Sequence, residues 1–574
     1  MNFIHKIVPS TDWIKSYSKD WFKADLIAGL TLGIILIPQG MAYAMIAGLP
    51  PVYGLYTALF PSIIYAFLGT SRHIHVGTVA LDSLFVASVV SILAQEGTEN
   101  FVLIALLLTF LVGVIQFAFG LLRLGFLVNF LARPVIIGFT SAAAIVIALN
   151  QVKHMTGAEM ARGASLQELF TNIFGGLDSV HLLTLVIGLI LVGISITWKK
   201  VFPKFPSALV LVFISVLAAY FIGFDSMGVQ LVGDIPSGLP SFNLHNLDSE
   251  LVLKLLPYAA ALALLGFMEA ISIGKVIEER HDYYRIRPNQ ESIALGVVNM
   301  ISSFFSAYVS TASFSRTAIN DQSGGKTPIV GIISAVVVLI SILFLTPLFF
   351  FLPKVVLGVI IFMSVLQLID LKAPKALWRS TKKDFIMYAF TLLATLFIGI
   401  QAGLAVGIGI SLIVLLYTIS APHMAEMGEV KGKKGVFRNV NRFEELNIDN
   451  QTLIVRFDAR LFYANIDYFR DGISEYEHKR NGEVKHIIID CSGINSVDAT
   501  ALHALRRLHL SYKKRGIKLI FVSLKGPVRD LFKNEGVYRQ FGKEAFFINT
   551  AEALEFITNP DYKRTNEIAF QSDV

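Results

Sequence analysis

The chain has 574 residues, of which 54% are hydrophobic and 16% are charged, and its formal net charge is +7. About a quarter of the residues of an ordinary soluble protein are charged, so the composition excludes that class and predicts an integral membrane protein. The positive charge does not indicate nucleic-acid binding, because basic residues of membrane proteins gather in cytoplasmic loops and no stripe of basic and aromatic residues is present. The single Cys491 excludes an intramolecular disulfide framework.

Residues 1–23 predict a cytoplasmic arm, because they lack the pattern of a secretory signal. Residues 24–420 predict a transmembrane domain made of apolar runs, many of them near the ~20 residues that cross a bilayer as a helix. We expect a first set of spans at 24–47, 51–69, 78–94, 101–122, 127–149, 180–197 and 207–224. A second set follows at 252–274, 289–308, 313–322, 327–345, 353–369, 384–400 and 402–420.

The loops that follow alternate spans carry most of the positive charge. Their basic residues lie at Arg72, Arg123, Lys199 to Lys204, Lys275 to Arg287, Lys326 and Lys372 to Lys383. Such loops face the cytoplasm. The pattern therefore predicts a multi-pass protein of the cell (inner) membrane with both termini in the cytoplasm, which agrees with an even number of spans.

The composition changes after the last expected span. Residues 421–435 contain several Gly and Lys residues and predict a linker. From 436 to 560, short β-rich runs such as "HIIIDCSG" and "KLIFVSL" alternate with helical patterns. This alternation predicts a small soluble α/β domain, followed by a C-terminal tail at 561–574.

Two of the expected spans are entered through polar segments. The third follows "SRHIHVG" at 71–77, and the short tenth opens with "STASFSR" at 310–316. The two spans are offset by seven in the chain order, so they occupy corresponding positions in two halves of opposite orientation. Paired, interrupted segments of this kind indicate the midplane binding site of a transporter. The alternative is two polar loops at the membrane edge.

A helix that begins inside the bilayer presents unpaired N–H groups and a partial positive charge, and two such helices make an anion site. The candidate residues are Gly77, Thr78 and Val79 at the third span and Ser313, Phe314 and Ser315 at the tenth. Arg316 adds a permanent positive charge; its alternative role is to pair with a buried carboxylate or carbonyl. Gln39 and Tyr43, one turn apart on the first span, are candidates to line the same site.

Two carboxylates lie within apolar spans. Glu269 interrupts "ALALLGFMEAISIGK", and because a charged side chain at the bilayer centre costs at least about 2.5 kcal/mol, we expect it to carry a coupling proton or to form a structural ion pair. Asp82 is a second candidate, with local capping or pairing as its alternative. His73 and His75 lack the further ligands that a zinc site requires, so we expect no metal and no cofactor.

Long stretches of the chain closely resemble the SulP anion transporters, called solute carrier family 26 in animals. They include "IPQGMAYAMIAGLPPVYGLYTALFPSIIYAFLGTSRHIHVGTVA", "RPNQESIALGVVNMISSFFSAYVSTASFSRTAINDQSGGKT" and "LPKVVLGVIIFMSVLQLID". The run "IIIDCSGINSVDATALHALRRLHLSYKKRGIKLIFVSLKGPVRDLF" resembles a STAS domain. The resemblance implies an α-helical polytopic membrane protein with a 7+7 inverted repeat and a cytoplasmic α/β STAS domain. It also implies a core domain (spans 1 to 4 and 8 to 11) that moves against a gate domain like an elevator, in a homodimer.

The resemblance also implies roles for particular residues. The family's anion site maps onto Gln39, Tyr43, Val79 and Ser313 to Arg316, and its acidic position onto Glu269. A Glu there favours a proton over sodium as the coupling ion. The phosphorylated serine of related antagonists corresponds to Thr500, where helix capping by Asp498 and Thr500 is the alternative.

The function implied is secondary active transport of a small inorganic anion, with sulfate first and a proton as the coupling ion. Bicarbonate, chloride or a dicarboxylate are alternatives within the family. Two more distant alternatives are a nucleobase permease and a signalling protein whose STAS domain binds a cytoplasmic partner. No arrangement of nucleophile, base and oxyanion donors is visible, so we expect no enzyme.

Overall fold

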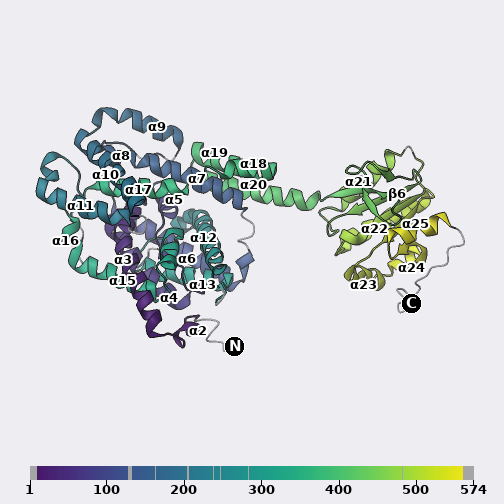
Figure 1. Ribbon diagram of the computed structural model, residues 1–574, viewed down its shortest axis with the longest axis horizontal. Helices are drawn as coiled ribbons and strands as arrows, with labels where there is room; N and C mark the ends of the chain where they lie inside the picture. Colours follow the sequence, from purple (N-terminus) through teal and green to yellow (C-terminus); the bar gives the residue numbers. More distant parts are fainter. Residues whose placement is uncertain are drawn as a thin grey trace. The chain divides into compact units, whose positions relative to one another are not determined.

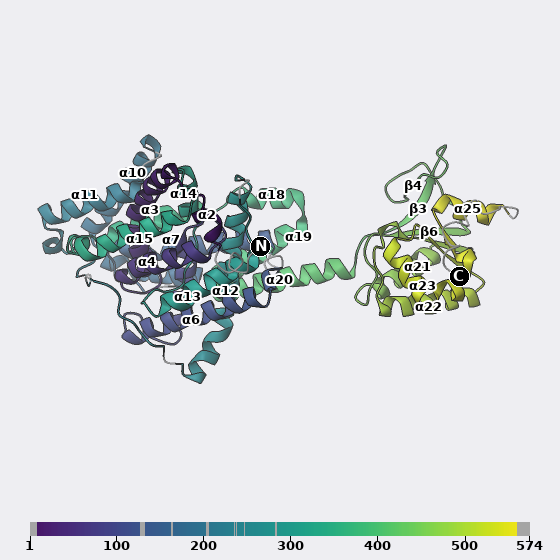
Figure 2. The ribbon, with the colours of Figure 1, turned by 90° about the horizontal axis from the view of Figure 1, so that it is seen from below.

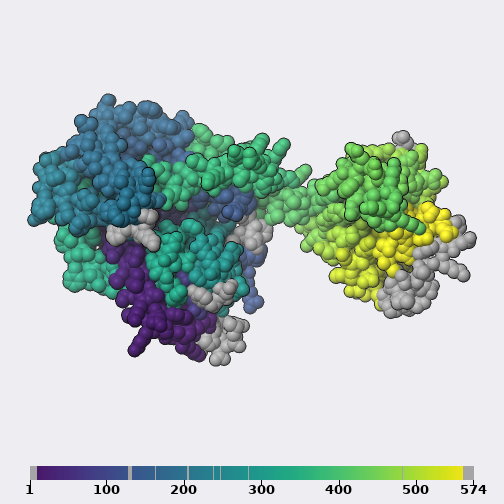
Figure 3. Space-filling model, viewed as in Figure 1, coloured from purple at the N-terminus to yellow at the C-terminus, as the bar shows by residue number. Residues whose placement is uncertain are grey.

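The computed structural model describes residues 9–126, 132–161, 163, 165–202, 206–234, 236, 238–245, 247–281, 284–480 and 482–559. The chain forms two compact units, Met1–Leu412 and Ile413–Val574 (Figures 1 and 3). The first is mostly helical, and the second is built on a β-sheet. Parts of the expected N-terminal arm (1–8), the start of the expected fifth span (127–131) and the expected tail (561–574) lie outside the described residues.

The helices of the first unit, which we call the membrane unit, follow the apolar runs of the sequence. Those that coincide with expected spans are α3 (Lys19–Ile46), α4 (Pro51–Leu68), α5 (Ala80–Val90), α6 (Glu99–Leu121), α7 (Arg133–Asn150), α10 (Leu182–Val201), α11 (Ser207–Ile222), α12 (Ser249–Glu278), α13 (Pro288–Ser303), α14 (Phe314–Gln322), α15 (Ile329–Ile340), α17 (Lys354–Val365), α19 (Lys382–Phe397) and α20 (Ile400–Ser420). Among the described residues, nine helices are long and apolar enough to cross a membrane. That all fourteen positions span the bilayer stays a prediction.

Several shorter elements lie between these helices. They are α2 (Thr11–Ile14), α8 (Val152–Thr156), α9 (Leu166–Gly175), α16 (Thr346–Phe349), α18 (Ala373–Ser380) and the two-residue strands β1 (Val76–Gly77) and β2 (Thr311–Ala312). α3 begins five residues before the expected first span, because Ser18 caps it: its hydroxyl accepts a hydrogen bond from the Trp21 N–H. The predicted arm is therefore shorter than residues 1–23.

The helices around the two strands pack so that helices from the first half of the membrane unit contact helices from its second half. α6 contacts α12 and α13, while α15 contacts α3 and α4 (Figure 2). α3 and α4 approach so closely that a Cβ added to Gly54 would overlap with the carbonyl oxygen of Gly40. Small residues allow membrane helices this approach. The contacts fix the ends of the helices that carry the two polar entry segments.

The second unit contains one mixed sheet of seven strands in the order β4-β3-β6-β7-β8-β9, with β5 paired to β3. The strands are β3 (Met424–Val430), β4 (Phe437–Asn439), β5 (Leu446–Asn447), β6 (Thr452–Phe457), β7 (His486–Asp490), β8 (Lys518–Val522) and β9 (Phe546–Phe547). The helices are α21 (Ile466–His478), α22 (Ala499–Lys514), α23 (Gly526–Asn534), α24 (Val537–Phe541) and α25 (Thr550–Thr558). β6, β7, β8 and β9 are parallel. This is the α/β architecture expected from the alternating pattern.

The predicted linker at 421–435 is wrong in part, because it contains β3. This strand pairs antiparallel with β6, with Ala425 opposite Arg456, and also with β4. The buried side chains of Ala425 and Met427 alternate with more exposed ones, as a half-buried strand requires. The charged and glycine residues around them hid this short pattern.

The start of α22 separates two roles that the sequence left open. Asp498 caps the helix, since its carboxylate accepts a hydrogen bond of 2.8 Å from the Ala501 N–H. Thr500 is exposed on the first turn. Capping therefore rests on Asp498, and modification of Thr500 stays a prediction.

The single cysteine provides a direct test of the fold of the second unit. Cys491 follows β7 and is buried in the hydrophobic core. Burial, together with the nearby Asp490, raises the pKa of the Cys491 thiol. Because the thiolate is the reactive form, we expect no labelling of the native protein by a maleimide between pH 7 and 9, and one label per chain after denaturation, measured by mass spectrometry. Rapid labelling of the native protein would contradict this packing.

Candidate anion site

The two polar entry segments meet in the structure. β1 and β2 pair antiparallel, with Val76 opposite Ala312 and Gly77 opposite Thr311. The Ser313 N–H extends the pairing by donating to the carbonyl oxygen of His75 at 3.1 Å. We call these two paired strands the ribbon. It joins segments more than 200 residues apart, and α5 and α14 each begin within three residues of it.

Both helices begin directly after the ribbon. Val79 is the extended residue before α5 and offers no side-chain cap, so the first N–H groups of α5 lack a side-chain acceptor. Ser313 precedes α14, and its hydroxyl accepts from the Arg316 N–H at 3.5 Å and contacts the Ser315 hydroxyl at 3.3 Å. The side chains of Phe314 and Ser315 are exposed. The partly positive N-termini of both helices therefore lie within a few residues of the ribbon.

Arg316 lies at the centre of this arrangement. Its side chain is fully buried, and within the described part of the chain Nε, Nη1 and Nη2 have no hydrogen-bond partner. A Cβ added to Gly77 would lie 3.3 Å from Nη2, so the guanidinium lies against the bare backbone of β1. The structure thus shows neither a carboxylate nor a carbonyl paired with Arg316. A buried and unpaired guanidinium is costly, and an anion at this position would satisfy it.

Side chains of α3 and of the segment before β2 surround the guanidinium. Tyr43 and Tyr308 both lie close enough to interact with Arg316 electrostatically. Gln39, one turn before Tyr43, has a buried Oε1 without a hydrogen-bond partner among the described residues. The Tyr308 hydroxyl contacts the Ser83 hydroxyl at 3.0 Å. Sequence reasoning missed Tyr308, although a tyrosine three residues before the ribbon in an apolar run is a usable signal.

Buried polar side chains hold the ribbon in place. Asn299 of α13 donates to the carbonyl oxygen of Ser310 at 3.1 Å and accepts from its N–H at 2.9 Å. Gln116 of α6 accepts from the Asn299 amide at 2.9 Å. The Thr311 hydroxyl donates to the Gly266 carbonyl oxygen at 2.8 Å. The ribbon is therefore anchored to α6, α12 and α13, and single residues such as Asn299 gave no sign of this in the sequence.

Two acidic residues lie on neighbouring helices near the site. Asp82 is in the first turn of α5; it is fully buried, and neither carboxylate oxygen has a hydrogen-bond partner within the described ranges. Glu269 of α12 lies close enough to Asp82 for the two carboxyl groups to interact. The local cap or ion pair considered for Asp82 is therefore not present. Two carboxylates so placed repel each other when both are charged.

His73 has possible metal ligands nearby that its sequence neighbours did not reveal. Its ring stacks on His281 with centroids 4.2 Å apart, and Asp321 completes a group whose ligand atoms lie within 4.8 Å of one another. Asp321, however, already accepts from His281 at 2.7 Å and from Arg280 at 3.1 Å. These bonds account for the cluster without an ion, and we assign no metal to it.

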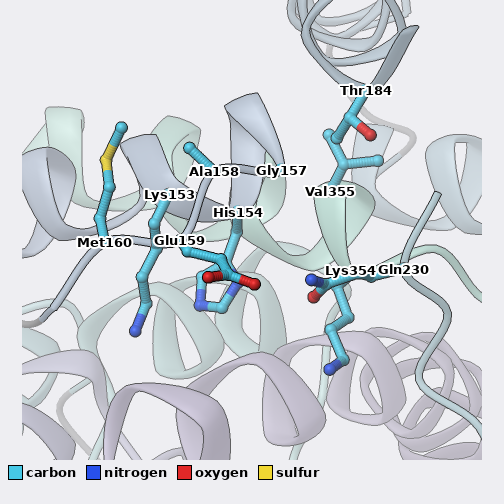
Figure 4. Close-up of a pocket in the computed structure, with 10 residues that line it drawn as sticks. All are labelled: Lys153, His154, Gly157, Ala158, Glu159, Met160, Thr184, Gln230, Lys354 and Val355. Atoms are coloured by element: carbon cyan, nitrogen blue, oxygen red, sulfur yellow. The ribbon is translucent and has the colours of Figure 1, made fainter. Parts of the chain in front are cut away.

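A hollow of about 190 Å³ lies elsewhere in the membrane unit (Figure 4). Lys153 and His154 of α8 line it together with Lys354 of α17. Glu159 adds a carboxylate on the same wall. No residue of the ribbon lines this hollow, so it is a separate place where an anion could bind and a useful alternative for experiments.

Comparison with known proteins decides between the functional classes. The model of the Sulfate permease family matches residues 22–391, and that of the STAS domain matches residues 445–553. The chain belongs to the sulfate permease family. Among curated relatives, "Sulfate transporter 4.1, chloroplastic" of Arabidopsis thaliana is 35% identical over 97% of this chain and 83% of its own length. "Sulfate transporter 1.3" of the same plant is 32% identical over 96% of this chain and 87% of its own length.

Solved structures agree with this membership. Murine Solute Carrier 26 family member A9, an anion transporter in the inward-facing state, matches with a TM-score of 0.89 and 26% identity, covering 97% of this chain and 94% of that chain. The transmembrane domain of a cyanobacterium bicarbonate transporter, BicA, matches with a TM-score of 0.60 over 69% of this chain and 98% of its own; at 23% identity it shows the fold alone.

The family confirms the main expectations from the sequence. The chain is a multi-pass membrane protein that transports anions, and its C-terminal unit contains a STAS domain. Because the sulfate permease family consists of transporters, the expectation that the chain is no enzyme is also confirmed. The exact number of spans, the inverted repeat and the residues of the anion site stay predictions.

Replacing Arg316 tests the anion site directly. A hydrogen bond to a charged group contributes about 1.5–3 kcal/mol, so Arg316→Ala should weaken anion binding by at least about tenfold in Kd, measured by isothermal titration of the purified protein. Arg123→Ala is the matched control, because it removes an arginine at the exposed end of α6. Equal affinity in the two variants would return Arg316 to a structural role.

Proposed function

We propose that this chain is a secondary active transporter of sulfate, which binds the anion between the first turns of α5 and α14. The observation that carries the proposal is the buried guanidinium of Arg316, which has no partner within the described residues. It belongs to the first turn of α14 and lies against Gly77, three residues before α5 begins. The curated relatives are named as sulfate transporters, and this supports the choice of sulfate.

The charge at the site matches a dianion. Each helix N-terminus contributes roughly +0.5, and the guanidinium adds a full positive charge that it does not lose in proteins. The total is about +2. Sulfate would neutralise this charge, whereas chloride or bicarbonate would leave it in excess; a dicarboxylate has the charge but is longer. A neutral nucleobase would leave the guanidinium without a counterion.

Uptake of sulfate requires an energy source. Moving one negative charge into an inside-negative cell costs about 2.3 kcal/mol per 100 mV, hence roughly 4.6 kcal/mol for a dianion. We propose that Glu269, together with Asp82, binds the coupling proton. Asp82 lies in the first turn of α5, where we place the anion, and Glu269 lies close enough to interact with it. A proton on the pair would relieve its repulsion and offset part of the charge of sulfate.

The remaining elements fit a moving core. We propose that α3 to α6 and α12 to α15 carry the anion together and move like an elevator against the other helices, in a homodimer. The anchoring of the ribbon to α6, α12 and α13 supports a rigid core, because both sides of the site are then tied to one group of helices.

We also propose that the N-terminus and the STAS domain face the cytoplasm at the cell membrane, where Thr500 is open to modification or a partner.

Proton coupling is tested by Glu269→Gln in proteoliposomes. The variant loses one carboxylate of the proposed pair and with it the repulsion that favours protonation, so sulfate uptake driven by an imposed pH gradient should fall to the rate without a gradient. Sulfate binding should persist, because Arg316 is intact. The readout is uptake of radiolabelled sulfate with the voltage clamped.

Glu250→Gln is the matched control, since Glu250 lies on the same helix, is exposed and pairs only locally with Lys254 at 2.7 Å. It should behave as the unmodified protein. Gradient-driven uptake at the normal rate by Glu269→Gln would overturn the coupling role. The same assay tests the choice of anion when labelled bicarbonate, chloride or a dicarboxylate replaces labelled sulfate.

A further inference from the structure

The short helix α18 lies between α17 and α19, next to the start of α19 (Figure 1). Lys372, Lys375 and Arg379 follow one another at spacings of three and four residues, which places them on one side of the helix. All three are exposed. On the other side, Ala373 is buried and Leu377 is half-buried. The helix is therefore cationic outward and apolar toward the membrane unit.

Two large apolar side chains accompany the basic ones. Leu371 is 85% exposed and Trp378 is 57% exposed. Trp378 precedes Arg379 by one residue and contacts the ring of Phe385 in α19, edge to face, with centroids 4.9 Å apart. Tryptophan is enriched where a protein crosses the interface between lipid and water. Exposed apolar groups beside exposed cations are typical of helices that lie in that interface.

The position of α18 is fixed from both ends. At its start, the Asp370 carboxylate accepts hydrogen bonds of 2.9 Å from the N–H groups of Lys372 and Ala373, while the Asp370 N–H donates to Ser141 of α7 at 3.4 Å. At its end, the Thr381 N–H donates to the Leu377 carbonyl oxygen at 2.9 Å, and α19 begins at the next residue. α18 is thus held against α7 at its start and against the beginning of α19 at its end.

No carboxylate among the described residues neutralises the positive charge of this helix. Across the described residues, no ion pair involves Lys372, Lys375 or Arg379. The one carboxylate at the start of the helix, Asp370, binds backbone N–H groups. Three cations on a fixed surface can be satisfied by phosphate groups, to which arginine and lysine donate charged hydrogen bonds.

We infer that α18 binds the phosphate headgroups of anionic phospholipids in the leaflet where α19 begins. Lys372, Lys375 and Arg379 hold the headgroups, while Leu371 and Trp378 insert among the first methylene groups of the acyl chains. Basic residues near an anionic surface are each attracted to it, so three of them enrich anionic over neutral lipid around this helix. The inference goes beyond anion transport and does not depend on which anion is carried.

The test uses the full chain in phosphatidylcholine vesicles that contain one tenth of a lipid with a spin label near its headgroup, either phosphatidylglycerol or phosphatidylcholine. Spin labels quench nearby tryptophan fluorescence. The signal of Trp378 is the difference between a given protein and the same protein with Trp378→Phe. We expect labelled phosphatidylglycerol to quench Trp378 at least about twice as strongly as labelled phosphatidylcholine.

The triple variant K372Q/K375Q/R379Q should lose this preference and show equal quenching by the two lipids. K431Q/K433Q/K434Q is the matched control, because it removes the same charge from the exposed turn between β3 and β4, and it should keep the preference. Equal quenching by both lipids in the unmodified protein, or a preference that persists in the triple variant, would overturn the inference. Quenching by neither lipid would place Trp378 outside the interface and overturn it as well.

Discussion

The pairing of β1 with β2 is the contact on which the rest of the membrane unit depends. Only a few backbone hydrogen bonds join the two strands, yet they tie together the segments from which α5 and α14 begin. The backbone N–H groups and the Arg316 guanidinium then concentrate positive charge inside an apolar helix bundle. Such an arrangement is costly without an anion and favourable with one. The charge that is costly to bury is the same charge that gives the site its affinity for an anion.

The surroundings of the ribbon show how this cost is tolerated. Asn299 bonds to the backbone of Ser310, directly before the second strand, and Gln116 accepts a hydrogen bond from Asn299. These bonds hold the segment that leads to Arg316 in place. The carboxylates of Asp82 and Glu269 lie on adjacent helices, yet neither neutralises Arg316. A separate anion site and proton site can therefore exist side by side, which is what coupled transport of a dianion needs. The cationic helix α18 adds a different interaction, with the lipid rather than with the substrate.

Much of this architecture is visible in the sequence, because long apolar runs and polar interruptions have few interpretations in a membrane protein. Gly77, Ser313 and Arg316 were found from such interruptions. The burial and pairing that matter most were not found: Gln116 and Asn299 come from α6 and α13, Tyr308 comes from the segment before β2, and only the fold brings them to the ribbon. β3 was missed for another reason, since two buried side chains among charged residues resemble a linker. The cluster around His73 could not be predicted either, because His281 and Asp321 are distant from His73 in the sequence.

The central claim is that the anion binds between the first turns of α5 and α14, at the guanidinium of Arg316. Selenate has the charge and nearly the size of sulfate, and selenium scatters X-rays anomalously. Crystals grown with selenate should therefore show one anomalous peak within about 4 Å of the guanidinium carbon of Arg316, close to the N–H groups that follow Val79 and Ser313. A peak in the hollow lined by Lys153, His154 and Lys354, with none at Arg316, would contradict the account.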